Sequence, residues 1–90
     1  MPYIYSKRKR IYNMLHFKDR RLVLFGLHVR GLREAKGMSI SDVAENTSLT
    51  KKDLLTIEEG SKNFGFTTML ELAKGLGEHP SRLLDINLEQ

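Results

Sequence analysis

Two short helix-start signals, eleven residues apart within Ser39–Gly60, constrain the fold of this 90-residue chain more than any other feature. At the first, Ser39 is an N-cap candidate, and Asp42 lies three residues on, where its carboxylate can accept the exposed N–H of the cap. Thr50 and Asp53 repeat the arrangement at the second. Each pair is a capping box with Asp in place of the commoner Glu or Gln. The spacing predicts two separate short helices in this stretch.

Each signal is also flanked by two apolar residues at the spacing of a hydrophobic staple, which fixes how the chain enters a helix. The pairs are Met38 with Val43 and Leu49 with Leu54. Only Asn46–Leu49 links the two helices. Helices joined so tightly cannot lie side by side as a long hairpin, so they must cross at a steep angle, which is the helix-turn-helix arrangement.

A longer helix is predicted before this unit, from Asp19 as a possible N-cap to a stop at Gly37. Gly26 and Gly31 weaken it relative to Ala, but their missing side chains permit close packing against another helix. Leu24 and Leu27 add apolar surface beside its main face, for the N-terminal segment or a dimer contact. The main face is formed by Leu22, Phe25, Val29 and Leu32.

Three further helices complete a predicted five-helix, all-α domain. The second runs from about Ile40 to Glu45, with Ala44 suited to a close helix crossing. The third follows Thr50 and ends at Gly60. The fourth begins near Thr67 or Thr68, and its apolar face contains Met69, Leu72, Ala73 and Leu76. The fifth begins at Pro80, with Leu83 and Leu84 facing inward and Ile86 and Leu88 in a short apolar tail.

The composition excludes several classes of protein. The chain has no cysteine, which excludes disulfides and thiolate metal sites and fits a reducing cytosolic compartment. Its longest apolar run, Leu22–Leu27, is far too short to span a membrane. His16, His28 and His79 are isolated, and no phosphate-binding or nucleophile motif is present. We therefore expect no enzyme, no metal and no cofactor.

The formal net charge of +4 is unevenly distributed. Residues 1–21 contain seven basic and one acidic side chains, a net +6, whereas residues 22–90 contain eight basic and ten acidic ones, a net −2. Long-range attraction to nucleic acid would therefore depend on the N-terminal segment. We expect residues 1–18 to form a basic extension (an arm, a strand or an added helix) and residues 19–90 to form the domain. The basic run is a candidate phosphate contact or a solvated tail, and it consists of Lys7, Arg8, Lys9 and Arg10.

From about Leu24 to Leu84 the chain resembles the phage repressor and Cro-type helix-turn-helix family, also called lambda-repressor-like. The matching pieces, in order, are LREAKGMS, DVAE, TKKDLLTIEEG and TMLELAKGLG, followed by a short terminal helix. The resemblance implies a five-helix DNA-binding domain, usually dimeric, whose third helix enters the major groove. It also implies a bacterial or phage protein of the cytoplasm, associated with the nucleoid.

The resemblance also assigns candidate site residues. Phosphate contacts are implied for Ser39, Lys62 and Asn63. Lys51 and Lys52 oppose the helix dipole where they stand, so they suit a phosphate or guanine better than they suit the helix. Leu55 is suited to a thymine methyl group or is an ordinary surface leucine. The implied base contacts are Thr50, Lys51, Lys52, Leu55 and Thr56.

A structural ion pair between Arg33 and Glu58 is implied as well, tying the first helix to the third. Five residues depart from the family pattern. Ser48 stands where the turn often has Gly, so an unfavourable backbone conformation is expected there. Ile40 replaces a frequent Gln, and Phe64 replaces a frequent Pro. Asp53 and Glu59 put negative charge near the groove face, although the capping box would turn the Asp53 carboxylate back to the helix.

Two classes of function fit these features. The first is a sequence-specific transcriptional regulator that occupies operator DNA as a dimer. The second is a protein-interaction module, such as an antitoxin or a regulatory adaptor, whose main ligand is a toxin-like protein partner. The net −2 of residues 22–90 favours the second, but the ordered set of matching pieces makes the first the leading hypothesis. Because one fold serves many functions, a binding experiment must decide between them.

Overall fold

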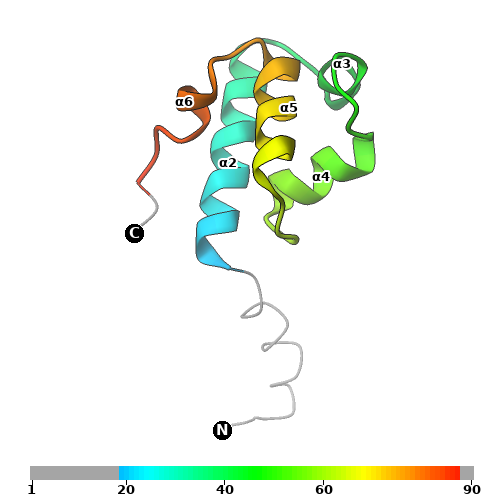
Figure 1. Cartoon of the computed structure of the whole chain (residues 1–90). Coiled ribbons are helices and arrows are strands. Elements are labelled where there is room, and N and C mark those ends of the chain that lie inside the picture. Colours follow the sequence, from blue (N-terminus) through cyan, green and yellow to red (C-terminus); the bar gives the residue numbers. More distant parts are fainter. Residues whose placement is uncertain (1–18, 88–90) are drawn as a thin grey trace, which may run out of the picture.

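The structure is a computed structural model that describes residues 19–87 and shows five helices and no strand within them (Figure 1). The predicted basic extension, with Lys7–Arg10, lies outside the described residues, as does Leu88. None of the described helices is both long enough and apolar enough to cross a membrane. The helices are α2 (Arg20–Ala35), α3 (Ile40–Glu45), α4 (Lys51–Glu59), α5 (Phe66–Leu76) and α6 (Pro80–Leu83).

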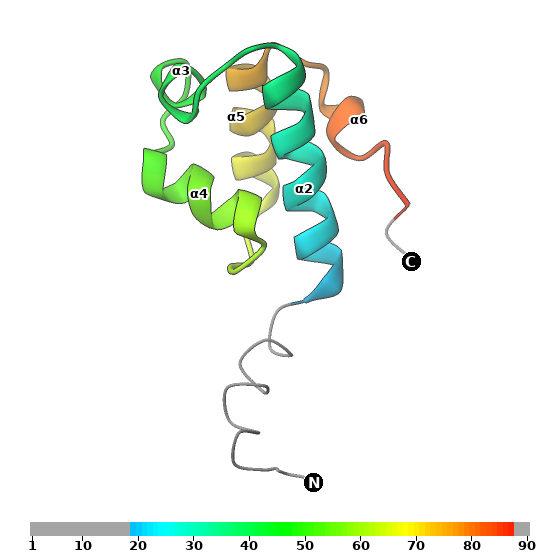
Figure 2. The same cartoon turned by 180° about the vertical axis from the view of Figure 1, so that it is seen from behind.

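The helices pack around one another so that α4 contacts α2 and α3, α5 contacts α3 and α6, and α6 also contacts α2. In two opposite views, α3 and α4 lie on one side of α2, and α6 lies on the other (Figures 1 and 2). The crossing of α3 and α4 therefore occupies one flank of the domain, and the C-terminal segment occupies the other.

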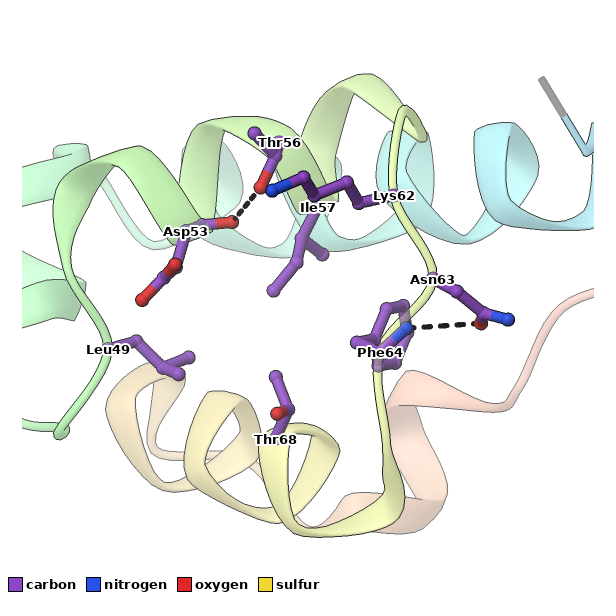
Figure 3. A pocket seen from close by; sticks show the side chains of 8 residues that line it. All are labelled: Leu49, Asp53, Thr56, Ile57, Lys62, Asn63, Phe64 and Thr68. Carbon is purple, nitrogen blue, oxygen red and sulfur yellow. Dashed lines mark hydrogen bonds between the residues drawn. The ribbon is translucent and has the colours of Figure 1, made fainter. Parts of the chain in front are cut away.

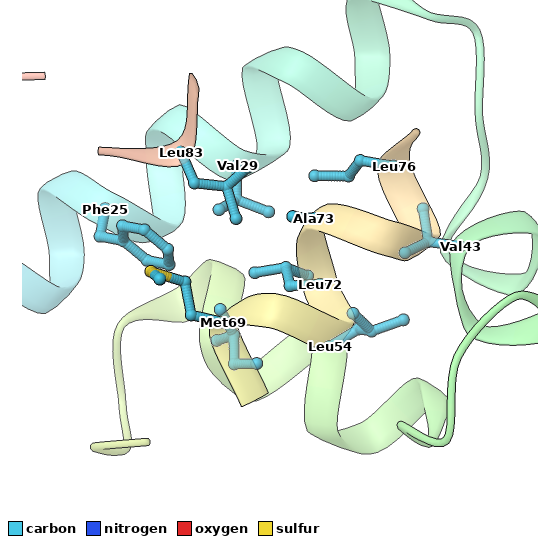
Figure 4. Close-up of a cluster of buried hydrophobic side chains, with 10 residues drawn as sticks. Phe25, Val29, Val43, Leu54, Met69, Leu72, Ala73, Leu76 and Leu83 are labelled. Atoms are coloured by element: carbon cyan, nitrogen blue, oxygen red, sulfur yellow. The ribbon is translucent and has the colours of Figure 1, made fainter. Parts of the chain in front are cut away.

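All five helices contribute to one apolar core (Figure 4). Burying a leucine side chain contributes roughly 1.5–3 kcal/mol, so Leu83, which is fully buried, anchors the four-residue helix α6. Leu84, predicted to face inward, is instead 52% exposed, because so short a helix turns only one face to the core. The core residues are Phe25, Val29, Val43, Leu54, Ile57, Met69, Leu72, Ala73, Leu76 and Leu83.

The helix ends follow the predicted signals with one exception. The Asp19 side chain caps α2 by accepting the Arg21 N–H, and Gly37 follows the helix with φ +68°. Gly60 ends α4 in the left-handed conformation, with φ +70°. The exception is α5, which begins at Phe66 rather than at Thr67 or Thr68, since Gly65 takes the extended N-cap position.

Close helix contacts are made at glycine, and Ala44 is partly buried and packs against the apolar core. A Cβ atom at Gly26 of α2 would collide with the carbonyl oxygens of Ile57 and Glu58 on α4. Gly31 was also expected to allow a close approach, but no atom lies within 4 Å of the position of its missing Cβ. Of the two glycines inside α2, only Gly26 therefore allows the close approach of α2 to α4.

Candidate nucleic-acid interface

Both predicted capping boxes are present and fix where the helix-turn-helix begins each helix. At α3, the Asp42 N–H donates to Ser39 Oγ at 3.0 Å, and the Ser39 N–H donates to Asp42 Oδ2 at 2.8 Å. At α4, the Asp53 N–H donates to Thr50 Oγ1 at 3.0 Å, and the Thr50 N–H donates to Asp53 Oδ2 at 3.0 Å. Each box satisfies two donors that the start of a helix leaves unpaired.

The second box decides how charge is arranged at the start of α4. The Thr50 N–H, by donating to the Asp53 carboxylate, holds the pKa of that carboxyl below its ordinary value, and the cations of Lys62 and Lys52 act in the same direction. The carboxylate is thus turned back onto the helix. Lys51 and Lys52 stand in the same turn and are exposed. The outward charge of this helix start is therefore positive.

The end of α4 is fixed to α2 by the ion pair between Arg33 and Glu58. Arg33 Nε donates to Glu58 Oε2 at 2.7 Å, and Nη2 donates to Oε1 at 3.0 Å. The remaining Arg33 nitrogen, Nη1, donates to the Met38 carbonyl at 2.9 Å. The carboxylate raises the pKa of Arg33. With 13% and 8% of their side chains exposed, the two residues form a charge-assisted bidentate contact between helices.

Two of the predicted base contacts, Thr56 and Leu55, have surroundings within the protein that differ from those of the exposed lysines. The Thr56 hydroxyl donates to the Asp53 carbonyl at 2.8 Å, so its proton is committed within α4 and only its oxygen lone pairs remain available. Leu55 is 47% exposed. It lines a hollow of about 460 Å³ between α2 and α4, together with Val23 and Leu27. Charged side chains, among them Glu58 and Glu59 of α4, line the rest of this hollow, so this side of α4 is mixed in character, whereas its start is cationic.

The predicted phosphate contacts Lys62 and Asn63 lie in the loop after α4, beside a second hollow of about 200 Å³ (Figure 3). Both are exposed. The Asn63 side-chain oxygen accepts the Phe64 N–H at 3.1 Å, which leaves the amide NH₂ group as the donor end. The Phe64 ring also contacts the Phe25 ring in a tilted arrangement, with ring centroids 5.1 Å apart, so an aromatic contact holds the loop where the family often has Pro.

Comparison with known proteins identifies the class. The helix-turn-helix domain family matches residues 24–84, more than half of the chain. The chain belongs to this family. A solved structure, the restriction-modification controller protein C.AhdI from Aeromonas hydrophila, is 35% identical with a TM-score of 0.66. The match covers 69% of this chain and 94% of that one. No curated protein sequence gave a significant match.

The resemblance predicted from the sequence is therefore confirmed, and with it the five-helix fold and the class, a helix-turn-helix DNA-binding transcriptional regulator. This family points to a non-enzymatic role. Between residues 19 and 87, no group of three or more His, Asp or Glu side chains is placed to hold a metal ion.

Sequence reasoning missed one contact of the helix-turn-helix unit. The Ser48 N–H and hydroxyl both donate to Glu71 Oε1, at 3.0 and 3.3 Å, so a carboxylate of α5 holds the turn. Ser48 was expected to need a left-handed backbone, but no non-glycine residue among those described has a positive φ. No local pattern marks Glu71, because the partners are 23 residues apart.

Proposed function

We propose that this protein is a sequence-specific regulator that occupies operator DNA as a dimer, with α4 in the major groove. The observation that carries the proposal is the start of α4. There two exposed lysines, Lys51 and Lys52, project from a turn whose only carboxylate, Asp53, is turned back to cap the helix. A cationic, rigidly capped helix start suits bidentate contact with guanine O6 and N7 or contact with phosphate.

The other proposed contacts surround this helix start. Lys51, Lys52 and Thr50 would read base edges, and the exposed Leu55 would meet a thymine methyl group. Thr56 would act as an acceptor, because its proton is already donated within the helix. The proposed phosphate contacts, which position the domain without reading sequence, are Ser39, Lys62 and Asn63, together with Lys7, Arg8, Lys9 and Arg10 of the extension.

A dimer would explain how so small a domain gains sequence specificity, since two copies read two half-sites. Exposed apolar side chains are available on both flanks: Leu27, 56% exposed, on α2, and Leu84, 52% exposed, after α6. By analogy with the similar controller protein, the regulated genes would belong to a restriction-modification system. Such a regulator would act in the cytoplasm, on the nucleoid.

Selection from a random duplex pool tests the proposal. We expect enrichment of a palindromic sequence whose half-site spacing reports the dimer geometry, and light scattering at micromolar concentration should show a dimer. Enrichment of a single, non-palindromic site with a monomeric protein would refute the dimer. No enrichment at all would favour the alternative, an antitoxin or adaptor whose ligand is a protein. The hollow beside Leu27 and Leu55, next to the groove face, would then be the first surface to test.

A further inference from the structure

The turn between α3 and α4 is held by one side chain of α5. Glu71 Oε1 accepts both the Ser48 N–H at 3.0 Å and the Ser48 hydroxyl at 3.3 Å. The same N–H, by donating, holds the pKa of the Glu71 carboxyl below its ordinary value. A charged acceptor makes a stronger hydrogen bond than a neutral one. The contact therefore ties the middle of the turn to a different helix.

A second observation shows that α5 is seated against the same turn. Gly75 lies one helical turn after Glu71, on the same face of α5. A Cβ atom at Gly75 would collide with the Thr47 methyl group and would lie 2.9 Å from the carbonyl oxygen of Val43. Glu71 and Gly75 thus meet the end of α3 and the turn together, one by hydrogen bonding and the other by close approach.

The opposite end of α4 is fixed by other contacts. There Gly26 of α2 allows the carbonyls of Ile57 and Glu58 to approach, and Arg33 pairs with Glu58. The start of α4 follows directly from the turn, since Thr50, its N-cap, is two residues after Ser48. The helix is therefore anchored at its end by α2, while its start is held by the buried Leu54 and by the turn.

We propose that Glu71 is a positioning residue for DNA recognition: by holding Ser48, it sets the angle at which α4 presents Lys51 and Lys52 to the groove. A nine-residue helix is roughly 13 Å long. A tilt of about 10° around its anchored end moves its start by about 2 Å, enough to break a hydrogen bond to a base edge. Loss of the Glu71 contact would therefore reduce discrimination between sequences without removing any group that touches DNA.

Two variants separate side-chain length from charge. Glu71→Asp keeps the charge but shortens the side chain by one methylene, about 1.5 Å, so that its oxygens no longer reach Ser48. Glu71→Gln removes the charge but keeps the length and an acceptor oxygen. Glu34→Asp and Glu34→Gln are matched controls, because Glu34 is exposed and pairs with Arg30 on its own helix.

The measurement is the ratio of affinities for a duplex selected from the random pool and for a random duplex of equal length. We expect Glu71→Asp to lower this ratio by about tenfold, the effect of one misplaced contact. Glu71→Gln should keep the ratio within about twofold, while binding of both duplexes tightens because a negative charge is lost. The two Glu34 variants should leave the ratio unchanged. An unchanged ratio in Glu71→Asp, or an equal loss in Glu71→Gln, would overturn the proposal.

The test rests on the proposed sequence-specific binding, so a second readout is independent of DNA. In Glu71→Asp, amide hydrogen exchange at Ser48–Lys52 should accelerate relative to the wild-type chain, whereas exchange at Ile57 and Glu58 should not. Equal exchange in the two proteins would refute the positioning role even if no duplex is preferred. A wild-type chain that prefers no duplex, with accelerated exchange in the variant, would instead refute the proposed operator binding.

Discussion

The guanidinium of Arg33 makes a two-point contact with the Glu58 carboxylate, its Nε and Nη2 atoms 2.7 and 3.0 Å from the two oxygens. Both side chains are mostly buried, and Arg33 Nη1 also binds the Met38 carbonyl. The pair therefore joins α2, α4 and the segment before α3. It fixes α4 from its C-terminal end, and both side chains also line the hollow between α2 and α4.

Replacing Arg33 by Ala should lower the free energy of unfolding by about 3 kcal/mol, because the Glu58 carboxylate would remain buried without its partner. Urea unfolding followed by circular dichroism measures the change. Arg30→Ala is the control, since Arg30 pairs with Glu34 on the exposed face of α2 and should cost less than about 1 kcal/mol. If the two substitutions lower the free energy of unfolding equally, the buried ion pair stabilises the domain no more than the exposed one does.

The two glycines of α2 should respond to alanine in opposite directions. Gly26→Ala should destabilise the domain by about 1–3 kcal/mol, because the added methyl group collides with the Ile57 and Glu58 carbonyls. Gly31→Ala meets open space and should stabilise it by about 0.5–1 kcal/mol through helix propensity. The melting temperatures of the two variants, compared with that of the wild-type chain, test both predictions. A stabilising Gly26→Ala would mean that α2 and α4 separate at little cost.

The Asp53 capping box predicts a dependence of stability on pH. The folded pKa of Asp53 is lowered, so its stabilisation is fully present above the unfolded pKa of about 4 and is lost as the pH falls through the folded value. Asp53→Asn keeps an acceptor but cannot titrate. The melting temperature of the wild-type chain should therefore fall more steeply between pH 5 and pH 3 than that of the variant.

A matched control for that titration is Asp85→Asn, since Asp85 is an exposed carboxyl after α6, 3.9 Å from Arg82. Its melting profile should follow the wild-type profile. An Asp53→Asn profile that is just as steep as the wild-type one would show that the Asp53 carboxylate does not cap α4 in solution.

Local signals made much of the fold predictable. Capping boxes act within four residues, so Ser39 with Asp42 and Thr50 with Asp53 could be identified directly from the sequence. The pairing of Arg33 with Glu58 came from the family resemblance, because a contact across 25 residues leaves no local trace. The physical reason is the same in both cases. An interaction between residues close in sequence leaves a recognisable spacing of residue types, whereas an interaction between distant residues does not.

The errors and omissions have a common origin in tertiary packing. The sequence predicts that Leu84 faces inward together with Leu83, but the four residues of α6 present a single buried face, which Leu83 occupies. Ser48 was expected to be strained, whereas a carboxylate from α5 supports the turn without a positive φ. Neither outcome could be read from periodicity, since both depend on which helix lies alongside.

Deletion of residues 1–18 should weaken binding to all duplexes by about the same factor. These residues carry Lys7–Arg10, and phosphate contacts add affinity without reading sequence. Fluorescence anisotropy with a selected duplex and a random duplex measures both affinities. Undiminished affinity for random DNA would assign the extension no part in binding. A loss confined to the selected duplex would instead indicate base contacts from the extension.

The double substitution Lys51→Ala with Lys52→Ala tests the groove assignment itself. Both side chains are exposed at the capped start of α4, where they oppose the helix dipole, so their removal should leave stability nearly unchanged or slightly raised. Binding should weaken, and if both lysines meet phosphate, the slope of log affinity against log salt should fall by about 2. A lysine that reads guanine would instead relax the sequence preference at its base pair.

Arg82→Ala is the control for lost positive charge, because α6 lies on the opposite side of α2 from α4 (Figures 1 and 2). It should change the salt slope by much less than one unit. A double lysine variant that keeps both the wild-type salt slope and the wild-type sequence preference would show that the N-terminal turn of α4 does not contact the groove. Equal effects from Arg82→Ala would show that only the net charge of the domain matters.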